Sequence, residues 1–177
     1  MVTDYAEFIG EINRALGIPA DYAKSRGLTL QIEAWPHELV IVSAPDAPRP
    51  VRLHETTAAA WTRLHTAAAR DEITLLPLSG YRSVARQEEI FRRKLGVGQS
   101  VEEILLINAA PGYSEHHTGR ALDIGTPNDP PCMESFAETT AFHWLKKHAG
   151  DFGFHLSYPR VNLHGISYEP WHWCWYG

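Results

Sequence analysis

The chain has 177 residues, enough for one compact domain with its own hydrophobic core. Hydrophobic residues make up 44% and charged residues 21%, which is typical of a globular protein, and the formal net charge is −5. That charge argues against a general electrostatic attraction to nucleic acid or to an anionic membrane. No apolar run approaches the roughly 20 residues that a membrane-spanning helix needs.

The first part of the chain alternates between helical and strand-like patterns. Apolar residues recur at helical spacing over residues 3–16, and Gly17 is suited to end that helix. Two β-rich runs, residues 28–33 and residues 38–43, predict strands separated by a turn. An alanine-rich periodic segment predicts a helix over residues 56–70.

The middle of the chain contains two helix starts that can be identified by their caps. Residues 73–78 predict a strand, after which Ser83 can cap a helix that runs to about Leu95. Ser100 and Glu103 have the spacing of a capping box and predict a second, short helix.

Towards the C-terminus the pattern changes to short strands around one more helix. Residues 108–118 are expected to be a loop and residues 121–124 a strand. Ser135 and Glu138 again have capping-box spacing, so we expect a helix there that ends at Gly150. Two further strands are predicted over residues 152–158 and 166–176. Together these elements predict an α+β single domain with a central, mainly antiparallel sheet flanked by helices.

The two cysteines, Cys132 and Cys174, form neither a disulfide framework nor a thiolate zinc site. The sequence favours free thiols and leaves one disulfide open. The first residues lack a basic start followed by an apolar core, so no signal peptide is recognised. If Met1 is the natural start, we expect a cytoplasmic protein, although a chain trimmed of its leader would look the same.

Two short segments concentrate side chains that can bind a metal ion. The first has the sequence SEHHTGRALD at residues 114–123, and the second has the sequence EPWH at residues 169–172. A catalytic zinc ion usually has three protein ligands, drawn from histidines and carboxylates, and leaves a fourth position open.

Within these segments, His116 and Asp123 can converge if Gly119 allows a tight turn into a strand. His172 would then complete a set of two histidines and one aspartate. Glu169 could lie beside the water at such a site and act as a general base without being a ligand. On residue types alone each side chain has an ordinary alternative, such as hydrogen bonding in the core, closing a loop or lying on the surface.

Both segments resemble motifs of one known family. The first matches the S-x-H-x-x-G-x-A-x-D pattern of the VanY-type zinc D-alanyl-D-alanine carboxypeptidases, and the second matches their E-P-W-H ending. Residues 79–83, with the sequence SGYRS, resemble a third motif of the family. The resemblance covers roughly residues 73–177. It implies a Hedgehog/D-Ala-D-Ala peptidase-like fold, with a carboxypeptidase core at residues 71–177 and an extension at residues 1–70 packed on it.

The resemblance also implies a role for each matching residue. One catalytic Zn²⁺ would be held by His116, Asp123 and His172. Glu169 would be the catalytic base, and Arg82 would stabilise the developing oxyanion. Ser114 would help to hold the terminal carboxylate of the substrate. Further substrate contacts are expected from Tyr81, Trp171 and Tyr158.

The chain departs from the family pattern at two places. The position after the first ligand is often glutamine in the family, whereas here it is His117, which could support a ligand or line the pocket. The family's Arg-Tyr-Pro segment is replaced by a segment with Tyr158 between serine and proline. Arg160 could compensate for the missing arginine.

The expected activity is removal of the C-terminal D-alanine from peptidoglycan stem peptides. We favour L,D-carboxypeptidase activity on tetrapeptides, because a D,D-enzyme in the cytoplasm would destroy wall precursors. D,D-activity on pentapeptides stays open. So do two other functions, an endolysin-like peptidoglycan endopeptidase and a non-enzymatic zinc-binding module. The sequence does not specify an oligomeric state.

Overall fold

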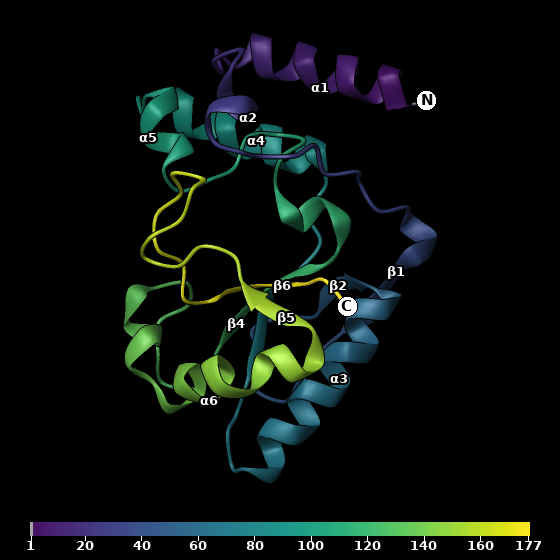
Figure 1. The fold of residues 1–177 in the computed structure, drawn as a ribbon, viewed down its shortest axis with the longest axis vertical. Helices are drawn as coiled ribbons and strands as arrows, with labels where there is room; N and C mark the ends of the chain where they lie inside the picture. Colours follow the sequence, from purple (N-terminus) through teal and green to yellow (C-terminus); the bar gives the residue numbers. More distant parts are fainter. Residues whose placement is uncertain (1) are drawn as a thin grey trace.

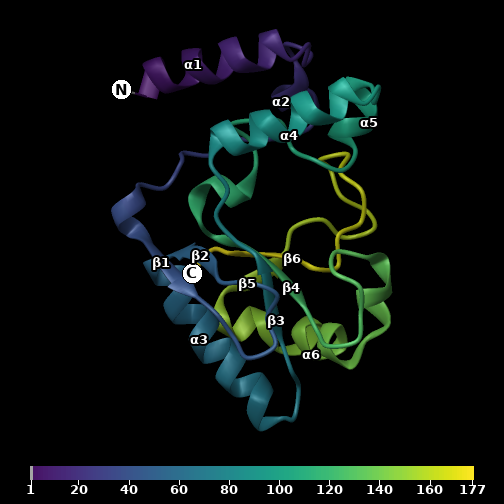
Figure 2. The same ribbon diagram turned by 180° about the vertical axis from the view of Figure 1, so that it is seen from behind.

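The computed structural model describes residues 2–177, with side chains from residue 4 onward. Figure 1 shows two parts, one above the other. The lower part contains the strands with helices α3 (Glu55–Arg70) and α6 (Thr140–His148), and the upper part is helical. The same arrangement is visible from behind in Figure 2.

The main sheet has four antiparallel strands in the order β3-β4-β6-β5. Its strands are β3 (Leu76–Ser79), β4 (Ala121–Gly125), β5 (Phe154–Leu156) and β6 (His172–Trp175). A separate antiparallel pair consists of β1 (Leu39–Val42) and β2 (Val51–His54). The predicted α+β class with a mainly antiparallel sheet is therefore confirmed.

The two faces of the sheet have different environments because successive side chains of a strand point to opposite sides. Leu122 and Ile124 of β4 and Trp173 of β6 are buried in one apolar cluster with α3 and α6. Asp123 and His172 alternate with these residues and therefore project from the other face. That face is turned towards the helical part of the molecule.

The helical part is held together by a second apolar cluster. It joins α1 (Val2–Ala15) to α2 (Tyr22–Ser25), α4 (Val84–Gly96) and α5 (Val101–Leu105). Ile9 and Leu16 of α1 pack in this cluster with Phe91 of α4 and Ile104 of α5. In Figure 1, α1 accordingly runs along the outer side of α4.

Several predicted boundaries are confirmed. The helices expected over residues 3–16 and 56–70 form as α1 and α3, and Gly17 ends the first with a φ of 75°. Ser83 Oγ accepts a hydrogen bond from the backbone N–H of Arg86 at the start of α4. Ser100 and Glu103 form the expected reciprocal capping box of α5.

Three predictions about the elements are wrong, and two elements were missed. Residues 28–33 form no strand; single backbone hydrogen bonds, including Gln31 N–H to Gly112 O, tie this extended segment to a neighbouring loop. Ser135 lies inside the 3₁₀ turn η3 (Glu134–Glu138), and Thr139 caps α6 instead by accepting from Phe142 N–H. The strand predicted over residues 166–176 is limited to β6, and β2 and α2 were not predicted.

The remaining boundaries shift by a few residues. The strand expected over residues 73–78 begins at Leu76, and the one expected over residues 152–158 is limited to β5. After α6 the chain continues as the 3₁₀ turn η4 (Ala149–Phe152) and turns at Gly153, which has a φ of 82°. Two more 3₁₀ turns are η1 (Pro36–Glu38) and η2 (Glu115–Thr118), the second inside the segment predicted to be loop.

Candidate metal centre and active site

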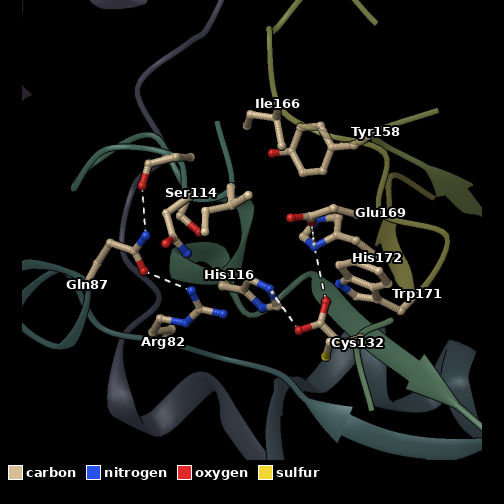
Figure 3. A pocket seen from close by; sticks show the side chains of 14 residues that line it. Arg82, Gln87, Ser114, His116, Cys132, Tyr158, Ile166, Glu169, Trp171 and His172 are labelled. Carbon is tan, nitrogen blue, oxygen red and sulfur yellow. Dashed lines mark hydrogen bonds and ion pairs between the residues drawn. The ribbon is translucent and has the colours of Figure 1, made fainter. Parts of the chain in front are cut away.

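Three buried side chains meet between the two parts of the molecule. Asp123 of β4 and His172 of β6 are direct cross-strand partners, and His116 comes from η2. Each offers one ligand atom, and these atoms all lie within 4.8 Å of one another. The structure therefore brings together the three residues predicted to bind a metal ion. Figure 3 labels the two histidines, His116 and His172.

A left-handed glycine makes this convergence possible. Gly119 ends η2 with a φ of 67°, and the chain then enters β4. A Cβ atom at this position would lie 2.7 Å from the backbone nitrogen of His54. Both the positive φ and the close approach of β2 exclude a larger residue, so the predicted tight turn depends on glycine.

Hydrogen bonds on the outer side of each imidazole fix the ring orientations. His116 Nδ1 donates to Gly80 O at 2.7 Å, which leaves Nε2 facing Asp123 Oδ2 at 3.5 Å. His172 Nε2 donates to Glu115 Oε2 at 2.8 Å, which leaves Nδ1 facing Asp123 Oδ1 at 3.2 Å. Such outer partners are typical of metal-binding histidines. His116 Nε2, His172 Nδ1 and the Asp123 carboxylate therefore face one common position.

Each of the three groups shifts the pKa of its neighbours. Burial acts to raise the pKa of Asp123, but the adjacent His116 and His172 lower it below its usual range. Burial lowers the pKa of His116. Burial acts in the same direction on His172, but its hydrogen bonds to Asp123 and Glu115 raise the pKa to about 10. The carboxylates are therefore ionised and compensated by imidazole, an arrangement in which a cation can replace a proton.

Glu169 lies beside the cluster without joining it. Its Oε2 is 3.7 Å from His172 Nδ1, and a backbone hydrogen bond from His172 N–H to Glu169 O closes the turn between the two residues. Burial is the main cause that raises the pKa of Glu169 to about 7. A carboxylate with such a pKa can both accept and donate a proton near neutral pH.

Arg82 approaches the cluster from the segment after β3. Its backbone N–H donates to His116 O, and its Nη1 donates to Gln87 Oε1 at 2.9 Å. Gln87 is fully buried, and its Nε2 donates to Ala109 O at 2.7 Å. Gln87 therefore orients the guanidinium, a role that was not predicted from the sequence. The available signal was a polar residue on the apolar face of a helix, at i+3 from Val84.

These residues surround a pocket of about 200 Å³ between the sheet and the helical part. It is lined by both predicted catalytic residues, Glu169 and Arg82, and by three of the four predicted substrate contacts, Ser114, Tyr158 and Trp171. The Ser114 side chain makes no capping hydrogen bond to η2. Figure 3 shows these side chains around the two histidines.

Tyr81 is the exception among the predicted site residues. Its hydroxyl donates to Glu33 Oε1 at 2.5 Å, and the guanidinium of Arg52 lies 5.0 Å from its ring centroid. It lines a separate, apolar groove with Tyr5 and Trp35. The structure therefore does not bring Tyr81 to the pocket of the metal cluster.

His117 has a structural environment. Its Nδ1 donates to Arg82 O at 2.7 Å, and its Nε2 accepts from Gly112 N–H at 3.1 Å. Burial lowers its pKa to about 4, so the ring is neutral at ordinary pH. Since both nitrogens are engaged by backbone, His117 supports the segment of Arg82. It does not line the pocket.

The cysteines and Arg160 also have defined places. Cys132 and Cys174 are free thiols, and Cys132 lies at the pocket. Arg160 pairs with Glu134 at 3.3 Å and stacks on Tyr168 at 4.3 Å. It does not line the pocket, so the structure gives no support to a compensating role.

A family model described as D-alanyl-D-alanine carboxypeptidase, VanY, matches residues 50–177. The chain belongs to the VanY family. This match begins at residue 50, well before residue 73, from which the sequence resembles the family, and it includes β2 and α3. Membership of the VanY family supports an enzyme of the carboxypeptidase class.

One curated relative is similar to this chain over about three quarters of both proteins. The bifunctional D-Ala-D-Ala dipeptidase and D-Ala-D-Ala carboxypeptidase VanXYC of Enterococcus gallinarum is 31% identical over 145 residues, which make up 77% of this chain and 74% of the relative. Other curated relatives are longer, and the chain spans only 45% and 44% of two of them.

Two solved structures share the fold. The LdcB LD-carboxypeptidase is 30% identical with a TM-score of 0.73, covering 81% of this chain and 70% of that one. The vancomycin-resistance D,D-pentapeptidase VanY, solved as a variant in complex with Zn(II), is 24% identical with a TM-score of 0.63, covering 86% and 88%. The expected D-Ala-D-Ala peptidase fold is confirmed. Within residues 2–177, every helix is too short or too polar to traverse a lipid bilayer.

Proposed function

We propose that this protein is a zinc carboxypeptidase that removes the C-terminal D-alanine from peptidoglycan stem peptides. The observation that carries the proposal is the convergence of His116, Asp123 and His172 on a pocket that also contains Glu169 and Arg82. A binding module would need the three ligands but neither the nearby carboxylate nor the held guanidinium.

The donor set suits zinc. Two imidazole nitrogens and one carboxylate oxygen are common ligands of catalytic zinc, and the pocket leaves one side of the cluster accessible. His116 would bind through Nε2 and His172 through Nδ1, because their other nitrogens are hydrogen-bonded. When bound, zinc would polarise the scissile carbonyl and lower the pKa of a water.

The side chains of the protein supply the remaining chemistry. Glu169 would accept the proton of the attacking water and pass it to the departing amine, as its raised pKa permits. Arg82, held by Gln87, would donate hydrogen bonds to the developing oxyanion. The hydroxyl of Ser114 would donate to the terminal carboxylate of the substrate. Tyr158 and Trp171 would form the walls of the pocket.

Two bonds could be cleaved by this site. We favour the L,D-bond of a tetrapeptide, and the likeness to the LdcB LD-carboxypeptidase, at 30% identity, supports this choice. The D,D-bond of a pentapeptide is the second candidate, supported by the likeness to VanXYC. The cytoplasmic location and the division at residue 70 stay predictions.

A direct test uses two defined peptides and mass spectrometry. The zinc-loaded protein is incubated with a tetrapeptide that ends in D-alanine after an L-centre, and with a pentapeptide that ends in D-Ala-D-Ala. We expect loss of one D-alanine, faster from the tetrapeptide. Faster cleavage of the pentapeptide would assign a D,D-carboxypeptidase, and cleavage only at internal bonds would contradict the proposal.

A further inference from the structure

The loop between Tyr158 and Glu169 carries pocket residues at both of its ends. Glu169 N–H donates to Tyr158 O at 3.1 Å, so the ten residues 159–168 form a closed excursion from the pocket. Ile166, within the excursion, also lines the pocket. The position of this loop therefore affects the candidate base and one wall of the pocket together.

The loop has internal order but little apolar anchoring at its tip. Asn162 Nδ2 donates to Pro159 O and Ile166 O at 2.9 and 2.8 Å, and Asn162 Oδ1 accepts from His164 N–H. Val161 and Leu163, at the tip, are 91% and 90% exposed. Since the tip buries almost no apolar surface, its position depends on polar contacts with other elements.

The main polar contact outside the loop is Arg26, the residue that follows α2. Its Nη1 donates a hydrogen bond to Leu105 O, at the end of α5, at 2.7 Å. The same nitrogen donates to two carbonyl oxygens of the loop, Gly165 O at 3.1 Å and His164 O at 3.4 Å. In return His164 Nδ1 donates to Arg26 O at 2.9 Å. Ser167 N–H adds a bond to Leu106 O at 2.7 Å. Both views show the yellow-green loop rising from the sheet to α5 (Figures 1 and 2).

A series of ring contacts links this anchor to the metal cluster. The ring of His164 contacts that of Tyr158 edge-on, with 6.2 Å between centroids. The ring of Tyr158 lies 4.9 Å from that of His172. Arg26 thus holds His164, and His164 packs on Tyr158 in the wall of the pocket. Tyr158 in turn packs on the candidate metal ligand His172.

We propose that Arg26 is a positioning residue that holds the 159–168 loop against α5 and thereby keeps Tyr158 and Glu169 in place over the metal cluster. The proposal rests on the proposed carboxypeptidase function for its effect on catalysis, but not for the hold on the loop. Arg26 lies outside residues 50–177, the part that the family model matches. The N-terminal segment would therefore act on the active site through the loop, although none of its described residues lines the pocket.

A simpler role would be local. Arg26 also lies 5.2 Å from the ring centroid of Tyr22, and its bond to Leu105 O ends α5. If these contacts alone mattered, truncation would disturb α2 and α5 and leave the loop unchanged. The two roles are therefore separated by a measurement on the loop itself.

Trypsin provides that measurement, because Arg160 lies in the loop and is followed by the exposed Val161. In Arg26→Ala we expect tryptic cleavage after Arg160 to accelerate about tenfold, since the loop loses its hydrogen bonds to a charged group. Arg26→Lys keeps the charge but loses the forked donor geometry, and should be cleaved at an intermediate rate. Arg86→Ala is the matched control: it removes an exposed arginine that pairs with Glu89 within α4.

On the preferred peptide, Arg26→Ala should lower kcat about tenfold, with a smaller change in KM. Cleavage after Arg160 at the wild-type rate in both Arg26 variants would overturn the proposal. So would faster cleavage with unchanged kcat and KM. An inactive wild-type protein would instead contradict the proposed function, and the trypsin comparison would still test the hold on the loop.

Discussion

The carboxylate of Glu115 lies 2.8 Å from Nε2 of His172, on the side of the ring that faces away from Asp123. The same carboxylate accepts a hydrogen bond from the Tyr176 hydroxyl at 2.5 Å. Burial acts to raise the pKa of Glu115, but its hydrogen bond with His172 is the main opposing cause, and the pKa falls to about 2. Glu115 is therefore ionised and aligns the imidazole for a metal ion.

Glu115→Gln should weaken zinc binding by about 10- to 100-fold. The negative charge of Glu115 orients the His172 imidazole and makes it more basic, and the variant loses this charge. A competition titration with a chromophoric chelator measures the affinity. Glu134→Gln, at an exposed site, is the control and should bind zinc as the wild type does. Equal affinities in the two variants would show that Glu115 has no such role.

The ligands and the base should respond differently to substitution. His116→Ala removes a ligand and should lose both zinc and activity. Glu169→Gln should retain one zinc ion per chain, measured by elemental analysis after dialysis, while kcat falls by about 10²- to 10⁴-fold. Substantial turnover in Glu169→Gln would exclude Glu169 as the base.

Gln87 should affect catalysis through Arg82. Gln87→Leu removes the acceptor that holds the guanidinium, so we expect kcat/KM to fall by at least about tenfold. Zinc affinity should not change, because Gln87 does not contact the metal cluster. Gln99→Leu, on the turn after α4, should leave the kinetics unchanged. A similar loss in both variants would point to a general effect on folding.

Gly119→Ala should destabilise the protein by at least about 2 kcal/mol, since the new side chain meets both an unfavourable φ and the backbone of β2. Chemical denaturation measures the change. The matched control is Gly96→Ala in the last turn of α4, where a Cβ atom has no neighbour within 4 Å. This control should be neutral or slightly stabilising.

Alkaline pH should weaken the hydrogen bond from the Tyr5 hydroxyl in α1 to Gln31 O in the segment after α2. Burial, together with the neighbouring carboxylate of Glu33, raises the pKa of Tyr5 to about 12. The folded state therefore binds the phenolic proton more tightly than the unfolded chain, whose tyrosines titrate near 10. Stability from this group is complete below pH 10 and is lost as pH rises towards 12. Denaturation midpoints between pH 9 and 11 should fall less in Tyr5→Phe than in the wild type.

The metal cluster could be predicted from sequence because its residues occur at fixed offsets within short motifs. His116, Gly119 and Asp123 belong to one turn and strand, so their relative placement is a local property. Glu169 and His172 are likewise placed by one turn. The motifs did not show which way the Tyr81 side chain points, because that depends on Glu33, almost fifty residues earlier in the chain.

Long-range contacts also explain the other misses. Arg26 acts on a loop that is distant in sequence, and Gln87 is held by Ala109, which lies 22 residues further along the chain. Neither residue lies in a motif. The strand predicted at residues 28–33 has the right composition but no neighbouring strand to pair with among the described residues. Strand β2 was missed because four residues are too few to establish an alternating pattern.

The alternation of side chains on β4 and β6 connects the metal cluster to the apolar core. Leu122 and Trp173 point into the core, and their neighbours Asp123 and His172 point to the pocket. A slip of either strand by one residue would exchange these sets, burying a charge among apolar side chains. The packing that selects the register therefore also sets the ligand spacing. A substitution that enlarges or truncates a core residue far from the pocket should therefore change the metal affinity, although the substituted residue contacts no ligand.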